Sequence, residues 1–181
     1  METKGTTAMT IEAAYQAAVE QGPITKEYKA NPKQIVKELN RLRSTEITSY
    51  LQYKQHAYMA VSLLAPALKK EFEAHAEQEL QHADMLADRI QQLGGVPLYE
   101  LQEIATKAAQ VGVHPEQGPK LTDMVMENLL IERTQVEAYT AFIRELGDQD
   151  LVTSRLLLSI LEHTEKHASE LADYLKRTAE T

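Results

Sequence analysis

A short phrase that opens with histidine occurs twice in the chain: residues 82–90 read HADMLADRI and residues 167–175 read HASELADYL. Glu79 precedes the first of these histidines by three positions. Residues three apart share one face of a helix, so Glu79 and His82 can hold the same metal ion. Carboxylate and imidazole groups are suitable ligands for iron, manganese and zinc. The repeated phrase therefore predicts that these two segments carry metal ligands.

A second pattern is also written twice, as Glu46 with Tyr53 and as Glu132 with Tyr139. Seven residues make close to two helical turns, so each glutamate and its tyrosine face the same way. The chain thus reads as two copies of one helical hairpin, in which a helix bearing glutamate is followed by a helix bearing histidine. Each tyrosine could donate an electron or simply hydrogen-bond a carboxylate, and the second role is favoured. Packing the copies about an approximate two-fold axis brings together the predicted catalytic and metal ligands, which are Glu46, Glu79, His82, Glu132 and His167.

One position breaks the symmetry of the two copies. Thr164 stands three residues before His167, where the first copy has a glutamate, and a hydroxyl is a poor substitute for a carboxylate. One metal position would then be weaker or completed by water. His163 lies one turn before His167 on roughly the same face and could replace the lost ligand, whereas Glu165 is nearly opposite on an ideal helix.

The composition favours an all-α protein. The 181 residues suit one domain with a sizeable core, and the good helix formers Ala, Leu, Glu, Gln and Lys dominate. The absence of cysteine excludes disulfides, thiolate metal sites and a cysteine nucleophile, and it fits a reducing compartment. Neither a signal peptide nor a membrane-spanning run is recognisable. We therefore expect a soluble, cytoplasmic protein.

The formal net charge of −8 argues against nucleic acid as a partner, because an acidic surface repels phosphate. The basic residues near the amino terminus are spread out and interleaved with acidic ones. They are read as solvated helix faces. Acidic groups would equally help to gather cations.

Turn and capping residues divide the chain into an N-terminal extension, residues 1–30, and a bundle, residues 31–181. Thr10 caps a short helix over residues 11–21. Short connections make neighbouring long helices antiparallel, while the long connection in the middle can cross the length of a bundle. The predicted fold is a ferritin-like four-helix bundle with this crossover. Its helices are expected at residues 32 to about 59–61, 66–93, 122–147 and 149–177, with a short helix over 98–109 in the crossover.

At these residues the sequence resembles the ferritin-like di-iron superfamily over residues 32–177. That family takes a Glu from each of two helices and a Glu-x-x-His motif from each of the other two. Glu46 matches the glutamate of the first helix, and Glu79 with His82 matches the motif of the second. Glu132 matches the glutamate of the third helix and His167 the histidine of the fourth.

Within this superfamily the chain is similar to bacterioferritins and to Dps mini-ferritins, as a mini-ferritin body with a bacterioferritin-type centre. The resemblance implies an iron-storage ferroxidase that binds two iron ions per subunit, oxidises Fe(II) with dioxygen or peroxide and stores ferric mineral. It implies a homo-oligomeric shell, with a dodecamer favoured over a 24-mer because no fifth helix is expected after Arg177. Leu80 stands where bacterioferritins have their haem-binding methionine, so no haem is expected.

Two other readings of the same residues remain open. One is another di-metal enzyme of this superfamily, such as a rubrerythrin-like peroxidase, a manganese catalase or an oxygenase, although the rubredoxin-like cysteines of a rubrerythrin are absent. The other is a non-catalytic shell protein whose centre has degenerated, with Thr164 as the first sign.

Overall fold

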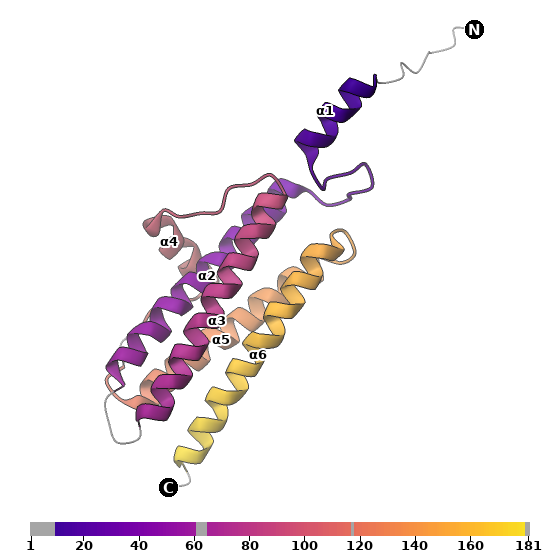
Figure 1. The fold of residues 1–181 in the computed structure, drawn as a ribbon. Helices are drawn as coiled ribbons and strands as arrows, with labels where there is room; N and C mark the ends of the chain where they lie inside the picture. Colours follow the sequence, from indigo (N-terminus) through magenta and orange to yellow (C-terminus); the bar gives the residue numbers. More distant parts are fainter. Residues whose placement is uncertain (1–9, 61–64, 117, 180–181) are drawn as a thin grey trace, which may run out of the picture.

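The computed structural model describes residues 10–60, 65–116 and 118–179, which form six α-helices and no strand (Figure 1). This confirms the predicted all-α fold, including the short helix before the bundle and the short helix in the crossover. The helices are α1 (Ile11–Gln21), α2 (Pro32–Met59), α3 (Ala65–Gln92), α4 (Leu101–Val111), α5 (Leu121–Leu146) and α6 (Leu151–Ala179).

The four long helices pack as two hairpins. α2 packs most extensively along α3, and α5 along α6, while α4 packs against α2 on the outside of the bundle (Figure 1). Buried apolar side chains form two main clusters along the bundle. One contains Leu42, Leu86, Tyr139 and Ile160, and the other contains Tyr53, Phe72, Val125 and Leu171.

The gap between these clusters is where the predicted ligands fall. On α2, for example, Glu46 follows Leu42 of the first cluster and precedes Tyr53 of the second. On α3 the order is reversed, as expected for an antiparallel helix: Glu79 and His82 lie between Phe72 of the second cluster and Leu86 of the first. Two apolar layers therefore enclose a polar one at mid-bundle.

Local capping explains where most helices begin. The Asn31 side chain accepts hydrogen bonds from the backbone of Lys33 at 3.1 Å and of Gln34 at 3.4 Å, and Pro32 occupies the first turn of α2. Thr10 caps α1 by accepting from Ala13 N at 3.2 Å. These starts agree with the sequence prediction.

The short helix of the crossover begins at Leu101, three residues later than predicted. Leu98 is held by α2: its backbone N–H donates to Asn40 Oδ1 at 2.8 Å, and its carbonyl accepts from Arg43 Nη1. Glu100 then caps α4 by accepting from Glu103 N at 2.7 Å. Contacts distant in sequence thus delay the helix.

The N-terminal part joins the bundle through its linker. Tyr28 donates a hydrogen bond to Asp150 Oδ2 at 2.6 Å, just before α6. α1 buries none of its residues and stands away from the four long helices (Figure 1). Residues 1–9 of the predicted extension lie outside the described residues, as does residue 61 at the far limit predicted for the first long helix. Among the described helices, none is both long and apolar enough to cross a membrane.

Candidate metal centre

The fold brings all five predicted ligands together. They come from all four long helices, and each is at most 1% exposed. Buried carboxylates are costly unless they are paired, neutralised or bound to a cation. The five are Glu46 on α2, Glu79 and His82 on α3, Glu132 on α5, and His167 on α6.

The ligand atoms fall into two halves that share Glu79. In the first half, His82 Nδ1 lies 3.1 Å from Glu46 Oε2 and 3.8 Å from Glu79 Oε1. In the second half, His167 Nδ1 lies 3.2 Å from the same Glu79 oxygen and 3.3 Å from Glu132 Oε1. Two ligand atoms that are each about 2.1 Å from one ion lie roughly 3.0–3.6 Å apart at common coordination angles. Both distances of the second half fall in this range, whereas in the first half the distance from His82 to Glu46 does and the distance from His82 to Glu79 is slightly longer.

Several atoms that face the centre have no hydrogen-bond partner among the described residues. They are Glu79 Oε1, Glu132 Oε2 and His167 Nδ1, all of them buried. His167 Nε2 lies 2.6 Å from Gln78 Oε1, and because that oxygen accepts, Nε2 carries the proton. Nδ1 then presents its lone pair to the centre. An unpaired buried polar atom costs about 1–3 kcal/mol, and a divalent cation would remove that cost.

The two tyrosines of the repeat bind carboxylates in a crossed pattern. Tyr53 donates to Glu132 Oε1 at 2.5 Å, and Tyr139 donates to Glu46 Oε1 at 2.7 Å. Each tyrosine thus hydrogen-bonds a carboxylate, the role favoured from the sequence. The carboxylate belongs to the other hairpin, however, and not to the tyrosine's own helix.

Gln135 is a residue of the centre that the sequence analysis missed. Its Nε2 donates to Glu46 Oε1 at 2.9 Å, and its Oε1 accepts from Ser49 Oγ at 3.2 Å. Its position three residues after Glu132 puts it on the ligand-bearing face of α5, which is the pattern that would have revealed it.

None of the three candidates for the missing carboxylate occupies its place. The Thr164 hydroxyl donates to the carbonyl of Ile160 in its own helix at 3.1 Å. His163 Nδ1 lies 3.0 Å from His82 Nε2, on the side of that ring away from the other ligands. Glu165 is exposed. Glu79 is therefore the carboxylate that the two halves share.

His75 was also missed, although it precedes His82 by seven residues and Glu79 by four on the same face of α3. It is 2% exposed, and its ring stacks on His167 with 3.9 Å between centroids. His75, Glu132 and His167 each offer a ligand atom, and these atoms lie within 4.8 Å of one another. The spacing H-x-x-x-E-x-x-H was the available signal.

Burial sets the protonation of the metal-free centre. It raises the pKa of Glu132 to about 8, with the hydrogen bond from Tyr53 acting in the opposite direction. Burial, reinforced by Glu46 and Glu132, holds the pKa of Glu79 well above its usual range. Burial also lowers the pKa of His167 to about 4, so this imidazole is neutral near pH 7. A cation binding here meets neutral imidazole and displaces protons from carboxyl groups.

Four long helices with carboxylates and imidazoles meeting in their core define a class: helical bundles that build metal sites from facing helices. A family model described as Ferritin, ferritin-like domain, matches residues 36–181. The chain belongs to this ferritin-like family.

Known relatives lie in two groups of that family. A bacterioferritin of Desulfovibrio desulfuricans is 25% identical over 151 residues, covering 81% of this chain and 79% of that protein. A nutrient stress-induced DNA-binding protein of Synechococcus is 30% identical over 146 residues, covering 78% of this chain and 81% of that protein.

Among solved structures, the dodecameric thioferritin of Bacteroides fragilis, a bacterioferritin-related protein, has a TM-score of 0.78 at 28% identity. The match covers 84% of this chain and 90% of that chain. An archaeal Dps homologue from Halobacterium salinarum has a TM-score of 0.74 at 26% identity, with 80% of each chain covered. The predicted resemblance to both groups is confirmed.

Proposed function

We propose that the chain is a ferroxidase that binds two Fe(II) ions at its intra-subunit centre, oxidises them with dioxygen or peroxide and stores the ferric product. The catalytic and metal-binding residues are Glu46, Glu79, His82, Glu132 and His167. The observation that carries the proposal is the position of Glu79 Oε1. It is buried, has no hydrogen-bond partner in the described part of the chain, and lies between the Nδ1 atoms of His82 and His167.

A pair of ions suits the chemistry. Two Fe(II) ions supply the two electrons that convert one dioxygen and two protons to hydrogen peroxide. The same two electrons convert one hydrogen peroxide and two protons to two waters. Three carboxylates and two imidazoles would hold the substrate ions. Gln78 and His163 would fix the orientation of the two rings through their outer nitrogens, at 2.6 Å and 3.0 Å.

The two ions should bind with different affinities, because only one carboxylate is shared between them. Thr164 supplies no ligand atom, because its hydroxyl bonds within α6. Glu79 is then the single shared carboxylate, and the second ion is expected to bind less tightly than the first. No haem is part of the proposal, since Leu80 has no group that could bind haem iron.

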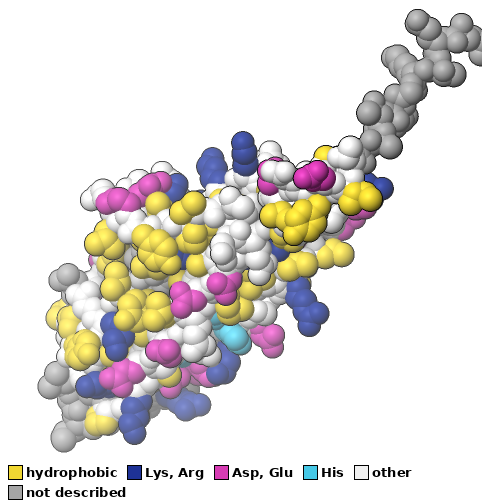
Figure 2. All heavy atoms as spheres, turned by 45° about the horizontal axis from the view of Figure 1, so that its top comes forward, with side chains coloured by type: hydrophobic (Ala, Val, Ile, Leu, Met, Phe, Trp, Pro, Cys, Tyr) yellow, Lys and Arg dark blue, Asp and Glu magenta, His cyan; other side chains and the backbone are white. Residues whose placement is uncertain are grey.

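Storage requires a shell, and a homo-oligomer of twelve subunits is proposed. Large apolar side chains remain exposed on every long helix, and the face in Figure 2 shows hydrophobic groups gathered between charged ones. Such surface marks interaction sites. The Bacteroides fragilis relative is a dodecamer. The exposed apolar residues of the long helices include Leu51, Tyr58, Leu80, Met126, Leu130, Leu151, Val152 and Leu158.

An anaerobic Fe(II) titration of the metal-free protein, followed by air or peroxide, tests the proposal. We expect two ions per subunit that oxidise as a pair. Glu46→Ala and Glu132→Ala should each abolish fast oxidation while leaving the helical circular-dichroism spectrum unchanged. Glu137→Ala, an exposed glutamate on α5, is the matched control and should oxidise iron like the wild type.

Other outcomes identify the rival functions. Unchanged oxidation rates in both ligand variants would remove this centre from consideration. Peroxide turnover without mineral formation would favour another di-metal enzyme, such as a peroxidase, catalase or oxygenase. A wild type that binds no metal tightly would favour a non-catalytic shell protein.

A further inference from the structure

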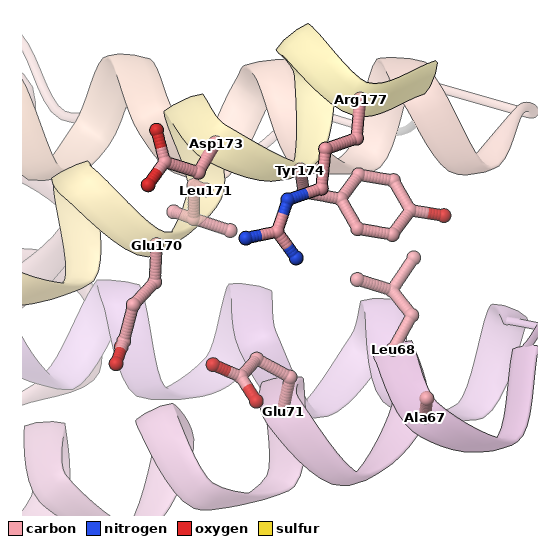
Figure 3. A pocket seen from close by; sticks show the side chains of 8 residues that line it. All are labelled: Ala67, Leu68, Glu71, Glu170, Leu171, Asp173, Tyr174 and Arg177. Atoms are coloured by element: carbon pink, nitrogen blue, oxygen red, sulfur yellow. The ribbon is translucent and has the colours of Figure 1, made fainter. Parts of the chain in front are cut away.

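A cavity of about 290 Å³ lies between the first half of α3 and the last half of α6. Figure 3 shows Glu71 rising from α3 and Glu170 from α6 into the same gap, with Arg177 above them. Of the two glutamates on the cavity wall, Glu71 is exposed to solvent and Glu170 is half-buried. The other lining residues are Ala67, Leu68, Leu171, Asp173, Tyr174 and Arg177.

The two glutamates of the cavity wall also converge on His75, a buried histidine of α3. His75 Nε2 lies 3.2 Å from Glu170 Oε2 and 3.5 Å from Glu71 Oε1. One ligand atom from each of the three residues lies within 4.8 Å of the others. Two carboxylates and an imidazole suit a divalent first-row cation. The three residues pass from exposed to half-buried to buried, as a path inward requires.

His75 also faces the metal centre. Its ring stacks on His167 with an interplanar angle of 19°, and its Nδ1 is buried without a hydrogen-bond partner among the described residues. The near-parallel stack means that the in-plane lone pairs of the two rings do not converge on one ion. His75 is thus placed to pass a cation on and less suited to share one permanently with His167.

The charges around Glu71, His75 and Glu170 favour weak, reversible binding of a cation over tight binding. Lys166 Nζ lies 3.3 Å from Glu170 Oε1, which leaves the other carboxylate oxygen toward His75. Asp173, on the cavity wall, is paired with Lys176 at 2.9 Å. Together with Arg177 these cations offset part of the negative charge. A cation held here would bind weakly and leave readily.

We propose that Glu71, His75 and Glu170 form an outer Fe(II)-binding site through which the substrate ion reaches the Glu132–His167 half of the centre. This inference rests on the proposed function for its final destination. The outer site itself is a separate binding event, made by residues that are distinct from the five ligands of the centre.

The first test counts ions. Metal-free full-length protein is titrated with Mn(II), and free Mn(II) is followed by electron paramagnetic resonance. We expect the wild type to bind a third, weaker ion that the double variant Glu71→Gln/Glu170→Gln loses while it keeps the inner pair. Asp173→Asn makes the same charge change per residue on the same cavity wall and should keep all three ions. A wild type that binds the inner pair but no further ion, or a double variant that retains the further ion, would overturn the outer site.

The second test measures the route. The chain has eight tyrosines and no tryptophan, and Tyr53 and Tyr139 contact ligands of the centre, so tyrosine fluorescence reports its loading. In stopped-flow mixing with Co(II), we expect the double variant to load the centre at least about tenfold more slowly, because local carboxylates raise cation capture. Asp173→Asn should stay within about twofold of the wild type.

The outcomes separate the two proposals. Normal loading rates in the double variant, with two ions in the centre, would refute the access route and leave the ferroxidase centre standing. An empty centre in the wild type, with one ion lost on Glu71→Gln/Glu170→Gln, would refute the centre and retain the outer site. Loss of the inner pair in the double variant would show that these glutamates only support the centre, which contradicts the inference.

Discussion

Two buried polar clusters in this bundle differ in how fully their atoms are paired. Near the start of α6, Arg89 Nη2 binds both oxygens of Asp150 at 2.9 and 2.8 Å. Asp150 also accepts from Tyr28 at 2.6 Å and from the Thr153 backbone at 2.9 Å. In the metal centre, by contrast, atoms of Glu79, Glu132 and His167 have no hydrogen-bond partner within the described residues.

The pKa values of the two clusters move in opposite directions. Burial alone would raise the pKa of Asp150, but hydrogen bonds from Thr153, Tyr28 and Arg89 outweigh it and hold the pKa below its usual range. At Glu132 burial prevails, and the pKa rises to about 8. The first cluster satisfies its charges internally and ties α3, α6 and the linker together. The second leaves buried polar atoms without a hydrogen-bond partner, as the proposed cation site requires. In this comparison the completely paired cluster is structural, and the incompletely paired one is the candidate binding site.

The largest expected effect breaks the paired cluster. Arg89→Met should lower the free energy of unfolding by about 3–5 kcal/mol, because it leaves the buried Asp150 carboxylate without its cation. Urea unfolding of the metal-free protein measures this. Arg133→Met, at an exposed arginine on α5, is the control and should stay within about 0.5 kcal/mol of the wild type. Equal stabilities of the two variants would refute the distinction between the clusters.

The matching change in the metal centre should raise the free energy of unfolding of the metal-free protein. Glu132→Gln removes a carboxylate that is costly to ionise and should stabilise the metal-free protein by about 1–3 kcal/mol near pH 7. The same variant should weaken binding of the second ion by at least about 10–100-fold. A loss of that size already follows when a residue that only hydrogen-bonds a metal ligand is mutated. Urea unfolding and Mn(II) titration measure the two effects. A destabilised variant would mean that this carboxylate is already satisfied.

A pH series sharpens the comparison further. Between pH 4.5 and about 8 the folded metal-free protein holds a proton on Glu132 that the unfolded chain has released, so its stability falls as pH rises. His167, with a folded pKa of about 4, has the opposite effect below pH 6.5. From pH 6.5 to 8 we therefore expect a loss of up to about 1.4 kcal/mol per pH unit for each such carboxyl group. Urea midpoints should show this slope in the wild type and a shallower one in Glu132→Gln. A flat wild-type profile would contradict it.

The smallest effect is expected at Thr164. Because its hydroxyl bonds to its own helix, Thr164→Val should leave the number of bound ions unchanged and alter stability by only about 0.5–1.5 kcal/mol, the net worth of one hydrogen bond. Thr164→Glu would restore the family's second Glu-x-x-His motif and should tighten binding of the second ion. Mn(II) titration separates the two variants. Loss of an ion in Thr164→Val would make the hydroxyl a ligand after all.

The sequence was sufficient to predict the hairpins and the convergence of the five predicted ligands, because the helical period and the internal repeat act together. Glu46 and Glu132 each follow from the repeat and from one apolar stripe per helix. His75 was missed although its spacing from Glu79 was visible. The second copy has no histidine at the corresponding position, four residues before Thr164, so the repeat did not point to it. Contacts between helices could not be derived in the same way. The period fixes the direction in which Tyr53 points, but only packing decides that its partner is Glu132.

The start of the short crossover helix shows the same limit. Residues 98–100 have no local signal that forbids helix, yet Asn40 and Arg43 hold Leu98 through its backbone. Similarly, the position of His163 beside the outer nitrogen of His82 depends on how α3 and α6 approach one another. Such pairings depend on geometry between elements, which spacing within one element does not carry.

The crossed tyrosine bonds have a consequence for the history of the chain. Tyr53 and Glu132 lie 79 positions apart, in different copies of the repeat, and Tyr139 and Glu46 lie 93 apart. A substitution at either tyrosine leaves a carboxylate in the other copy without its partner. The two copies therefore cannot drift independently, and selection that acts on one hairpin also constrains the other.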